Sequence, residues 1–322
     1  MKRKLTLLVS TLLFTACSHT GNHLDSLPSP KKVEMDSIEV PPVLLSVTRM
    51  FLSGDRLVAY QERNDTLFSF WKLPDCKFLY AAGVRGEGPN EFLMLDRNFQ
   101  EKPNGFSSFE IQANRIKEVE ALDDGTFRIT SCRSVNTDLQ PLNRLLMLAD
   151  SSFCFVSDNE EYEFTLLKKD GITHDFGNYP LRLLQEEADT PHRFTYNKLT
   201  VAHPDGSRFA VFYAYVGLVR IYGADGTLQA ESVLPEKKTV SGEERTVYYR
   251  SFPYATSRSV YVLTQEADMT LLEQWSWKGE LEKRYVLPVA VSSFVVSESN
   301  NRMYAVSPER EDRIYTYPVS YT

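Results

Sequence analysis

The feature that most constrains this chain is a tight turn between two short runs of strand-forming residues, which recurs six times. The recurrences are spaced by 42 to 55 residues, and they fall near Gly54, Gly105, Ser151, Gly206, Arg258 and Asn300. A second turn comes about twenty residues after most of these; Gly226 follows Gly206 in this way, and Pro235 then ends the next run. Glycine suits a hairpin position that needs a positive φ, and proline cannot donate to a strand ladder. Each step therefore holds four short strands.

The runs between the turns are rich in β-branched and aromatic residues. Examples are VAY, AVFY, VRIY, SVYVL and RMYAV, which are typical of strands. Four strands in a unit of about fifty residues are typical of a propeller blade. The chain of 322 residues therefore predicts an all-β fold, a six-bladed β-propeller with four antiparallel strands per blade, within residues 35–322. A pair of β-sandwiches would also explain the many strands, but it does not explain the recurrence of one pattern.

The two ends of the chain are predicted to close the ring. The last unit begins near Val289 and has room for only three strands before Thr322. The segment from Asp36 to Pro42 precedes the first unit, and its Val-Pro pair matches the Leu-Pro pair that ends at Pro235. An open ring would leave two exposed strand edges. We therefore expect the N-terminal strand to complete the last blade as its fourth strand.

The first residues form an export signal rather than part of the fold. Residues 1–16 carry a basic start, an apolar stretch and a small-residue end, which is the pattern of a secretory signal too short to span a membrane. The ending before Cys17 resembles the lipobox of bacterial lipoproteins, which implies that Cys17 carries lipid; an ordinary cleaved signal peptide is the alternative. Residues 17–34 are polar and contain two prolines, so we expect a flexible tether. By the same resemblance, Ser18 after the cysteine implies an outer-membrane lipoprotein that faces the periplasm or the cell surface.

Charge and cysteine content narrow the function classes. The 36 Lys and Arg residues against 43 Asp and Glu residues give a net charge of -7, which argues against a nucleic-acid partner. After Cys17 the chain has three more cysteines, Cys76, Cys132 and Cys154, and no CxxC pair. Three is an odd number, so at least one thiol is free or pairs outside the chain. We expect these thiols to be buried and to pack as small apolar side chains.

A glycine-rich segment carries a family resemblance. Residues 83–92 read GVRGEGPNEF, in which a G-x-G-P-x-E-F pattern is formed by Gly86, Gly88, Pro89, Glu91 and Phe92. With the lipobox and the six units, this resembles the six-bladed propeller lipoproteins of Bacteroidetes-type bacteria, often called TolB-like or NHL-like. The resemblance implies a cell-envelope propeller, and it assigns no reaction because a fold does not confer a function.

The same segment is predicted to be structural. A dinucleotide-binding loop needs GxGxxG between a strand and a helix, whereas here the glycine spacing is reversed and Pro89 follows at once. We expect a connection between blades in which Glu91 accepts backbone N–H groups and Phe92 packs between neighbouring blades. Contact with a ligand at a face of the ring is the alternative.

The candidate ligand-binding residues lie in a long connection. The segment from Leu184 to Tyr196 separates the third and fourth units and is less patterned than the other connections. Long loops often carry function. We therefore name His192, Arg193 and Phe194 as candidates for ligand contact.

Catalytic and metal-binding motifs are missing from the sequence. GxSxG and HExxH do not occur, and the five histidines have no paired spacing. We therefore expect no catalytic residue, no metal and no cofactor. The sequence predicts a lipid-anchored cell-envelope propeller that acts as a non-enzymatic binding or scaffold protein for a protein, peptide or glycan. The alternative is a propeller enzyme of the lactonase, lyase or hydrolase type, with a metal or polar site in the central channel.

Overall fold

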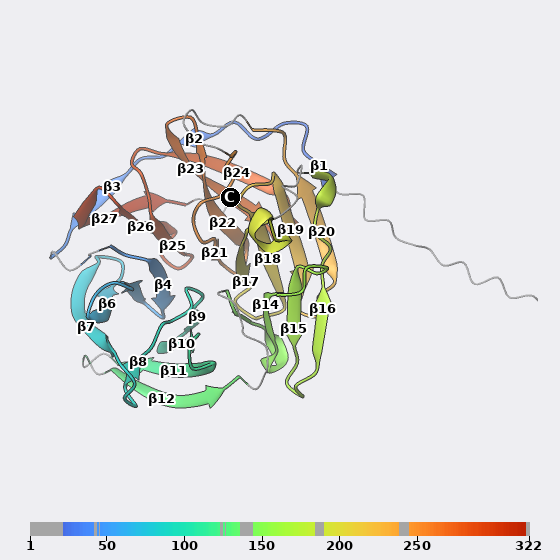
Figure 1. Cartoon of the computed structure of the whole chain (residues 1–322). Coiled ribbons are helices and arrows are strands. Elements are labelled where there is room, and N and C mark those ends of the chain that lie inside the picture. Colours follow the sequence, from blue (N-terminus) through green and yellow to red (C-terminus); the bar gives the residue numbers. More distant parts are fainter. Residues whose placement is uncertain are drawn as a thin grey trace, which may run out of the picture.

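Six β-sheets are arranged in a ring around a central channel (Figure 1). The computed structural model describes residues 22–41, 44, 46–122, 125, 127–135, 144–183, 190–237 and 245–319. In each sheet the strands follow one another from the channel outward, and consecutive strands of a blade are antiparallel. This confirms the predicted six-bladed β-propeller with four antiparallel strands per blade and excludes the pair of β-sandwiches.

The blades are numbered along the chain, and each is given from its innermost strand outward. Blade 1 contains β4 (Arg49–Ser53), β5 (Arg56–Tyr60), β6 (Thr66–Lys72) and β7 (Lys77–Arg85). Blade 2 contains β9 (Gln100–Lys102), β10 (Gly105–Glu110), β11 (Arg115–Ala121) and β12 (Phe127–Ser134). Blade 3 contains β13 (Leu146–Met147), β14 (Phe153–Val156), β15 (Phe164–Leu167) and β16 (Thr173–Phe176). Blade 4 contains β17 (Lys198–Ala202), β18 (Arg208–Tyr213), β19 (Leu218–Gly223) and β20 (Leu228–Val233). Blade 5 contains β21 (Tyr254–Ala255), β22 (Ser259–Glu266), β23 (Met269–Ser276) and β24 (Leu281–Leu287). Blade 6 contains β25 (Ser293–Ser297), β26 (Arg302–Ser307), β27 (Arg310–Pro318) and β3 (Asp36–Glu39).

The N-terminal strand closes the ring. β3 pairs antiparallel with β27, with Ile38 opposite Ile314. The sixth blade therefore takes its fourth strand from the other end of the chain, as predicted. Blades 1 and 6 are also joined near the channel, where the Met50 N–H donates to Ser293 Oγ at 2.8 Å.

The described part of the predicted tether runs along the outer rim of the ring (Figure 1). β1 (Asn22–His23) pairs in parallel with β20 of blade 4, and β2 (Lys31–Lys32) pairs in parallel with β24 of blade 5. Each pairing covers an outer edge that would otherwise present unpaired backbone groups. Strands of two residues leave no periodic signal in a polar sequence, which is why the sequence indicated only a tether. Cys17 and the predicted signal lie outside the described residues.

Aromatic side chains fill the spaces between neighbouring blades. Between blades 1 and 2, Phe68 lies 5.0 Å from Phe106 between ring centroids, and Phe51 stacks on Phe99 at 4.4 Å. Between blades 3 and 4, Phe164 meets Phe209 edge-on at 5.5 Å. Each such ring buries a large apolar area and adds a favourable ring–ring contact. These contacts hold the wedge-shaped blades together.

Gly206 shows why the turn between the first two strands of blade 4 needs glycine. Its φ is +73°, a conformation that L side chains rarely adopt. A Cβ at this position would lie 2.4 Å from the backbone nitrogen of Ala149 in blade 3, whose N–H donates to the Gly206 carbonyl at 2.9 Å. The hairpin of blade 4 therefore packs directly on blade 3, with no room for a side chain.

The three cysteines that the structure describes are free thiols. Cys76 and Cys154 are buried as expected, and burial raises the pKa of both, that of Cys76 to about 12. Cys132 is exposed, contrary to the expectation. It lies on β12, the outermost strand of blade 2, where side chains on the outer face meet solvent.

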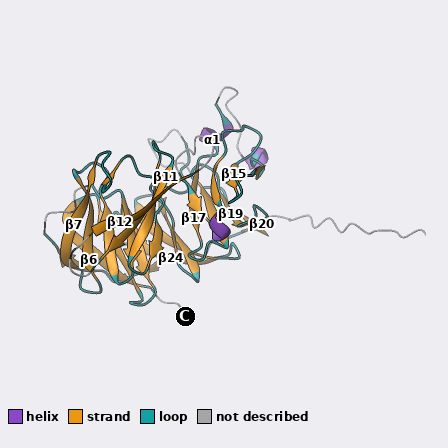
Figure 2. Cartoon of the chain, turned by 90° about the horizontal axis from the view of Figure 1, so that it is seen from below, coloured by secondary structure: helices purple, strands orange, loops and turns teal. Residues whose placement is uncertain are grey.

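Within the residues that the structure describes, helical structure is confined to short connections on the ring (Figure 2). The described helical segments are η1 (Ala149–Ser151), η2 (Leu181–Leu183) and α1 (His192–Thr195). None of these helices has the length and apolar character needed to cross a membrane.

Candidate functional site

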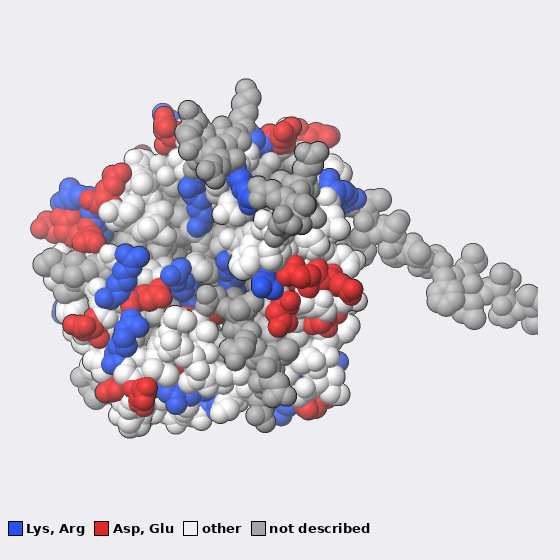
Figure 3. All heavy atoms as spheres, in the orientation of Figure 1, with Lys and Arg blue, Asp and Glu red and all other residues white. Residues whose placement is uncertain are grey.

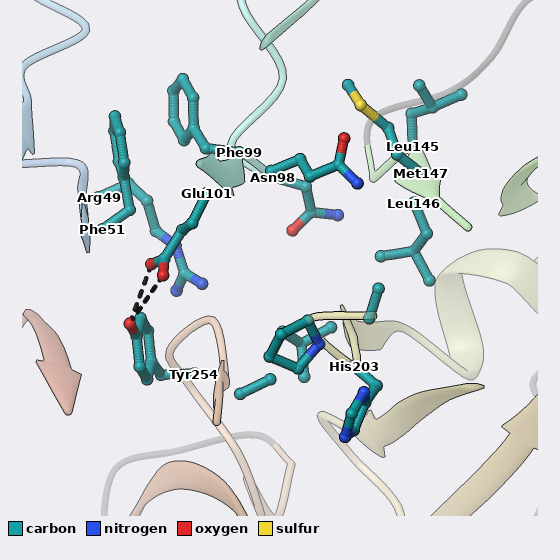
Figure 4. Close-up of a pocket in the computed structure, with 15 residues that line it drawn as sticks. Arg49, Phe51, Asn98, Phe99, Glu101, Leu145, Leu146, Met147, His203 and Tyr254 are labelled. Atoms are coloured by element: carbon teal, nitrogen blue, oxygen red, sulfur yellow. Dashed lines mark hydrogen bonds between the residues drawn. The ribbon is translucent and has the colours of Figure 1, made fainter. Parts of the chain in front are cut away.

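A pocket lies in the central channel between the innermost strands of five blades. Its cavity volume is about 100 Å³, and its lining comes from β4, β9, β13, β17 and β21 together with the residues that flank them. Figure 4 shows the labelled side chains around this cavity. We call it the channel pocket.

Three polar side chains meet on one side of the channel pocket, and we call Arg49, Glu101 and Tyr254 the channel cluster (Figure 4). Tyr254 Oη donates to Glu101 Oε1 at 2.9 Å. These residues belong to blades 5 and 2, which stand opposite each other in a ring of six, so the hydrogen bond spans the channel. The backbone N–H of Leu52 also donates to Glu101 Oε1, at 2.8 Å, and ties the carboxylate to blade 1.

Arg49 is held by backbone carbonyl groups. Its Nη1 donates to the Phe252 carbonyl at 3.0 Å, and its Nη2 donates to the Pro253 carbonyl at 2.8 Å. Burial lowers the pKa of Arg49 to about 10, so the guanidinium stays charged at neutral pH. The channel cluster therefore contains one fixed positive charge.

Glu101 is surrounded by protein but keeps access to solvent, because its side chain faces the channel. The surrounding protein disfavours the ionised carboxylate and raises the pKa of Glu101 to about 7. The hydrogen bonds from Leu52 and Tyr254 and the charge of Arg49 act in the opposite direction. Glu101 therefore changes its charge near neutral pH, as residues of functional sites often do.

The rest of the channel pocket combines an amide with apolar walls. Asn98 Nδ2 is buried and has no hydrogen-bond partner among the described residues. Phe51 and Phe99 form one stacked wall, and Met147 lies on the side of blade 3 (Figure 4). A buried donor without a partner is costly in a folded protein, so Asn98 has free capacity for a ligand or an ordered water.

His203 closes the pocket on the side of blade 4. Its Nδ1 lies 2.6 Å from Asp205 Oδ1, and its Nε2 lies 3.2 Å from the Ser257 carbonyl oxygen of blade 5. The ring also meets Trp277 at 4.8 Å between centroids. Both ring nitrogens are therefore occupied, and His203 serves as a wall of the channel pocket.

The sequence analysis did not single out the channel cluster, although its positions carry a common signal. Arg49, Glu101 and Tyr254 lie four or five residues before the turns at 54, 105 and 258. Met147 and Ala202 occupy the corresponding positions of blades 3 and 4 and also line the pocket. A comparison of residues at a fixed offset from each turn would have found the channel-facing positions.

The predicted ligand-binding residues lie elsewhere, on α1. The His192 N–H donates to Glu160 Oε2 at 2.8 Å, and Arg193 Nη1 donates to Glu160 Oε1 at 3.1 Å. Phe194 is 59% exposed. The structure thus brings these residues onto the acidic loop of blade 3, and they do not line the channel pocket; residues 184–189 of the same connection lie outside the described residues.

The glycine-rich motif forms a connection at the outer edge of blade 1. Glu91 Oε2 accepts the Gly88 N–H at 2.8 Å, and the Gly86 N–H donates to the Phe92 carbonyl at 2.9 Å. Phe92 is fully buried between Phe68 of blade 1 and Phe127 of blade 2. The short strand β8 (Glu91–Phe92) pairs in parallel with β7. Pro89 lies in the turn between these partners, and the motif is far from the channel in the sheet order.

A second polar cluster is fully enclosed between blades 3 and 4, and we call it the Glu163 cluster. The Glu163 carboxylate accepts Tyr213 Oη at 2.6 and 2.8 Å, Arg220 Nη1 at 2.7 Å and Tyr222 Oη at 3.3 Å. Lys198 Nζ lies 3.7 Å from Glu163 Oε1. Burial lowers the pKa of Lys198 to about 8.

Metal-ligating side chains are not grouped in the part of the chain that the structure describes. No set of three or more His, Cys, Asp or Glu residues is placed there to hold an ion. The polar side chains that line the channel pocket are one carboxylate, one guanidinium, one phenol, one imidazole and two amides.

The fold and the channel pocket together define a six-bladed β-propeller with a polar cluster in its channel. A Bacteroides fragilis protein classed as exported resembles the chain at 12% identity, with 92% of this chain and 97% of that chain covered and a TM-score of 0.57. A member of the DUF4221 family from Bacteroides vulgatus resembles it at 8% identity, with 88% and 96% covered and a TM-score of 0.56. At such identities the likeness concerns the fold alone. No protein-family model and no curated protein sequence matches the chain.

Proposed function

We propose that this chain is an exported, non-enzymatic binding protein of the cell envelope, and that it holds a group of its partner in the channel pocket. The observation that carries the proposal is the channel cluster. Opposite blades fix its polar groups through the Tyr254–Glu101 hydrogen bond, while the neighbouring Asn98 donor remains open. Rigid polar groups beside apolar walls are typical of ligand sites.

The proposal also includes the cellular location of the protein. The signal-like residues 1–16 and the lipobox ending at Cys17 support export and a lipid anchor in the outer membrane. The resemblance to propeller lipoproteins of the TolB-like or NHL-like type supports it as well. A protein of similar structure is classed as exported, which is consistent with this location. The partner would then be an envelope protein, peptide or glycan.

The proposal is tested by filling the pocket. The protein is immobilised and screened against peptide and glycan arrays, in parallel with two variants. Ala202→Phe fills the cavity, and Val84→Phe places the same side chain at the 47% exposed Val84 of β7. We expect a saturable ligand whose affinity falls at least about tenfold in Ala202→Phe and stays unchanged in Val84→Phe. Binding that Ala202→Phe leaves intact, or no saturable ligand at all, would overturn the proposal.

A propeller enzyme of the lactonase, lyase or hydrolase type is the second candidate, and one observation favours it. The pKa of Glu101, raised by burial to about 7, is suited to a carboxyl group that exchanges a proton at neutral pH. Glu101→Gln keeps an oxygen that can accept hydrogen bonds from Leu52 and Tyr254. Turnover of any ligand from the arrays that is lost in Glu101→Gln, with binding retained, would establish the enzyme.

A further inference from the structure

We infer that the channel pocket takes a small, neutral, hydroxyl-bearing group, such as one edge of a neutral sugar. This inference rests on the proposed function, because it names the ligand class of the same pocket. It follows from the balance of charge, from the hydrogen-bonding groups, from the apolar walls and from the volume.

The charges that line the pocket balance. Arg49 supplies one positive charge and Glu101 supplies one negative charge above its pKa of about 7. His203 also lines the pocket, and its Nδ1 faces the Asp205 carboxylate, which would balance a positive charge on the ring. A charged ligand would lose its hydration in a pocket with no net opposite charge, which is costly. A neutral ligand avoids this cost.

The polar groups of the pocket favour a ligand that both accepts and donates hydrogen bonds. Asn98 Nδ2 offers a buried donor with no partner among the described residues. Glu101 offers the remaining acceptor positions of its carboxylate, since Tyr254 and Leu52 donate mainly to Oε1. A hydroxyl group donates once and accepts at the same oxygen. Vicinal hydroxyls could therefore satisfy Asn98 and Glu101 together.

The apolar walls suit the carbon-bound hydrogens of a sugar. The stacked Phe51 and Phe99 rings border the cavity next to Asn98 and the channel cluster (Figure 4). A sugar is amphipathic, because its hydroxyls project outward while its C–H groups form apolar faces. Polar contacts on one side and aromatic contacts on the other match this division.

The volume sets how much of the ligand enters. The cavity of about 100 Å³ is smaller than the roughly 150 Å³ of an apolar cavity that admits benzene. One edge of a sugar ring, with two hydroxyls or a hydroxymethyl group, therefore fits inside. The remainder of a glycan would extend along the channel.

The distribution of charge on one face of the ring agrees with a neutral group rather than a single charge. Figure 3 shows Lys and Arg side chains around the centre of this face, with Asp and Glu side chains among them. A ligand approaching the channel thus meets charges of both signs.

The test compares matched sugars on the full protein at pH 8, where Glu101 is ionised. The probes are glycerol, glucose, galactose and mannose, with 6-amino-6-deoxyglucose and glucuronate as the charged counterparts, and binding is followed by ligand-observed NMR. We expect at least one neutral sugar to bind about tenfold more tightly than its charged counterpart. Ala202→Phe should abolish this binding, while Val84→Phe should retain it.

Two near-isosteric variants change the charge of the pocket without changing its shape. Glu101→Gln leaves the charge of Arg49 unbalanced and should shift the preference toward glucuronate. Asn98→Asp adds a negative charge, removes the open donor and should shift the preference toward 6-amino-6-deoxyglucose. Thermal unfolding of each variant checks that the ring is intact, and the Asn98 backbone N–H bond to Asp96 Oδ1 at 2.7 Å does not depend on the side chain.

The outcomes separate the inference from the proposed function. Charged sugars that bind the unchanged protein as well as neutral ones, or variants that leave the preference unchanged, overturn the inference. If no sugar or glycerol binds but the arrays give a ligand that Ala202→Phe rejects, the inference fails and the proposed function stands. If the arrays also give no such ligand, both fail.

Discussion

Glu101 and Glu163 are two carboxylates of one ring, and each accepts a hydrogen bond from a tyrosine and lies near a positive charge. Glu163 is fully enclosed between blades 3 and 4, where two tyrosines and Arg220 donate to it and Lys198 lies close by. Glu101 faces the channel and receives hydrogen bonds from Tyr254 and Leu52. Protein groups use the hydrogen-bonding capacity of the Glu163 carboxylate, whereas the capacity of the Glu101 carboxylate is only partly used.

Saturation and enclosure of the carboxylate distinguish a structural ion cluster from a binding site in a fold that contains both. A saturated and enclosed carboxylate serves the contact between blades. A carboxylate with open positions, beside the unpartnered Asn98 donor and a cavity, is available to a ligand.

Removing the enclosed carboxylate should cost the most stability. Glu163→Ala leaves Lys198 buried without its carboxylate and removes one of the two carboxylates of Arg220, which keeps Glu231. Breaking a buried pair in this way costs about 3–5 kcal/mol. The free energy of unfolding is measured by urea titration. Glu101→Ala is the matched control, and it should cost less than about 1 kcal/mol because water in the channel can replace the lost acceptor. Equal losses in the two variants would contradict the comparison.

The buried lysine of the Glu163 cluster should give stability a rise at alkaline pH. Burial lowers the pKa of Lys198 to about 8, whereas an unfolded lysine keeps its proton to about pH 10.4. Between these values the unfolded chain binds the extra proton, so stability increases with pH. The rise should be on the order of 2 kcal/mol relative to Lys198→Met, which has no proton to lose. Parallel unfolding curves from pH 7 to 10.5 would show a constant difference between the two proteins if Lys198 titrates normally.

Glu101 should contribute a smaller pH dependence of the opposite sign. Its pKa in the folded protein is raised by burial to about 7, above the ordinary value of 4.5. The folded chain holds the extra proton between these values, so this contribution is full at low pH and is lost as the pH rises through about 7. Solvent in the channel keeps the effect below about 1 kcal/mol. Glu101→Gln should flatten the difference in thermal midpoint between pH 4 and 8; an unchanged profile would place the titration elsewhere.

Tyr254→Phe should have the smallest effect. The hydrogen bond from Tyr254 Oη stabilises the ionised form of Glu101, so its loss should move the pKa of Glu101 above about 7 while stability stays nearly constant. The carboxyl carbon shift of Glu101, followed by NMR against pH, reports this change. A pKa that falls in Tyr254→Phe would show that the cross-channel bond favours the protonated form.

The sequence predicted the ring better than the pocket, for a physical reason. Turn residues such as Gly206 act locally, because a positive φ and a close backbone contact restrict the residue type at that position. The ring closure was also predictable, since β3 is the one strand needed to complete blade 6. The Tyr254–Glu101 bond joins residues 153 positions apart, and it exists only because ring closure places blades 2 and 5 opposite each other.

Residues 17–34 also show a limit of prediction from sequence. β1 and β2 pair with outer strands through two residues each, which leaves no pattern in the polar sequence of residues 17–34. His192, Arg193 and Phe194 were selected because their connection is long. The structure gives the first two local partners on Glu160, and whether the three contact a ligand stays a prediction.

The central claim is that Glu101 is the open carboxylate of a ligand site, and its own titration tests this most directly. Protein labelled with ¹³C at the glutamate carboxyl carbons is titrated by NMR, with Glu101→Gln used to assign the signal, before and after saturation with the ligand selected by the arrays. We expect a Glu101 transition near pH 7 that the ligand shifts, while the Glu163 signal does not respond to the ligand. A Glu101 signal that titrates near 4.5, or one that the ligand leaves unchanged, would contradict the account.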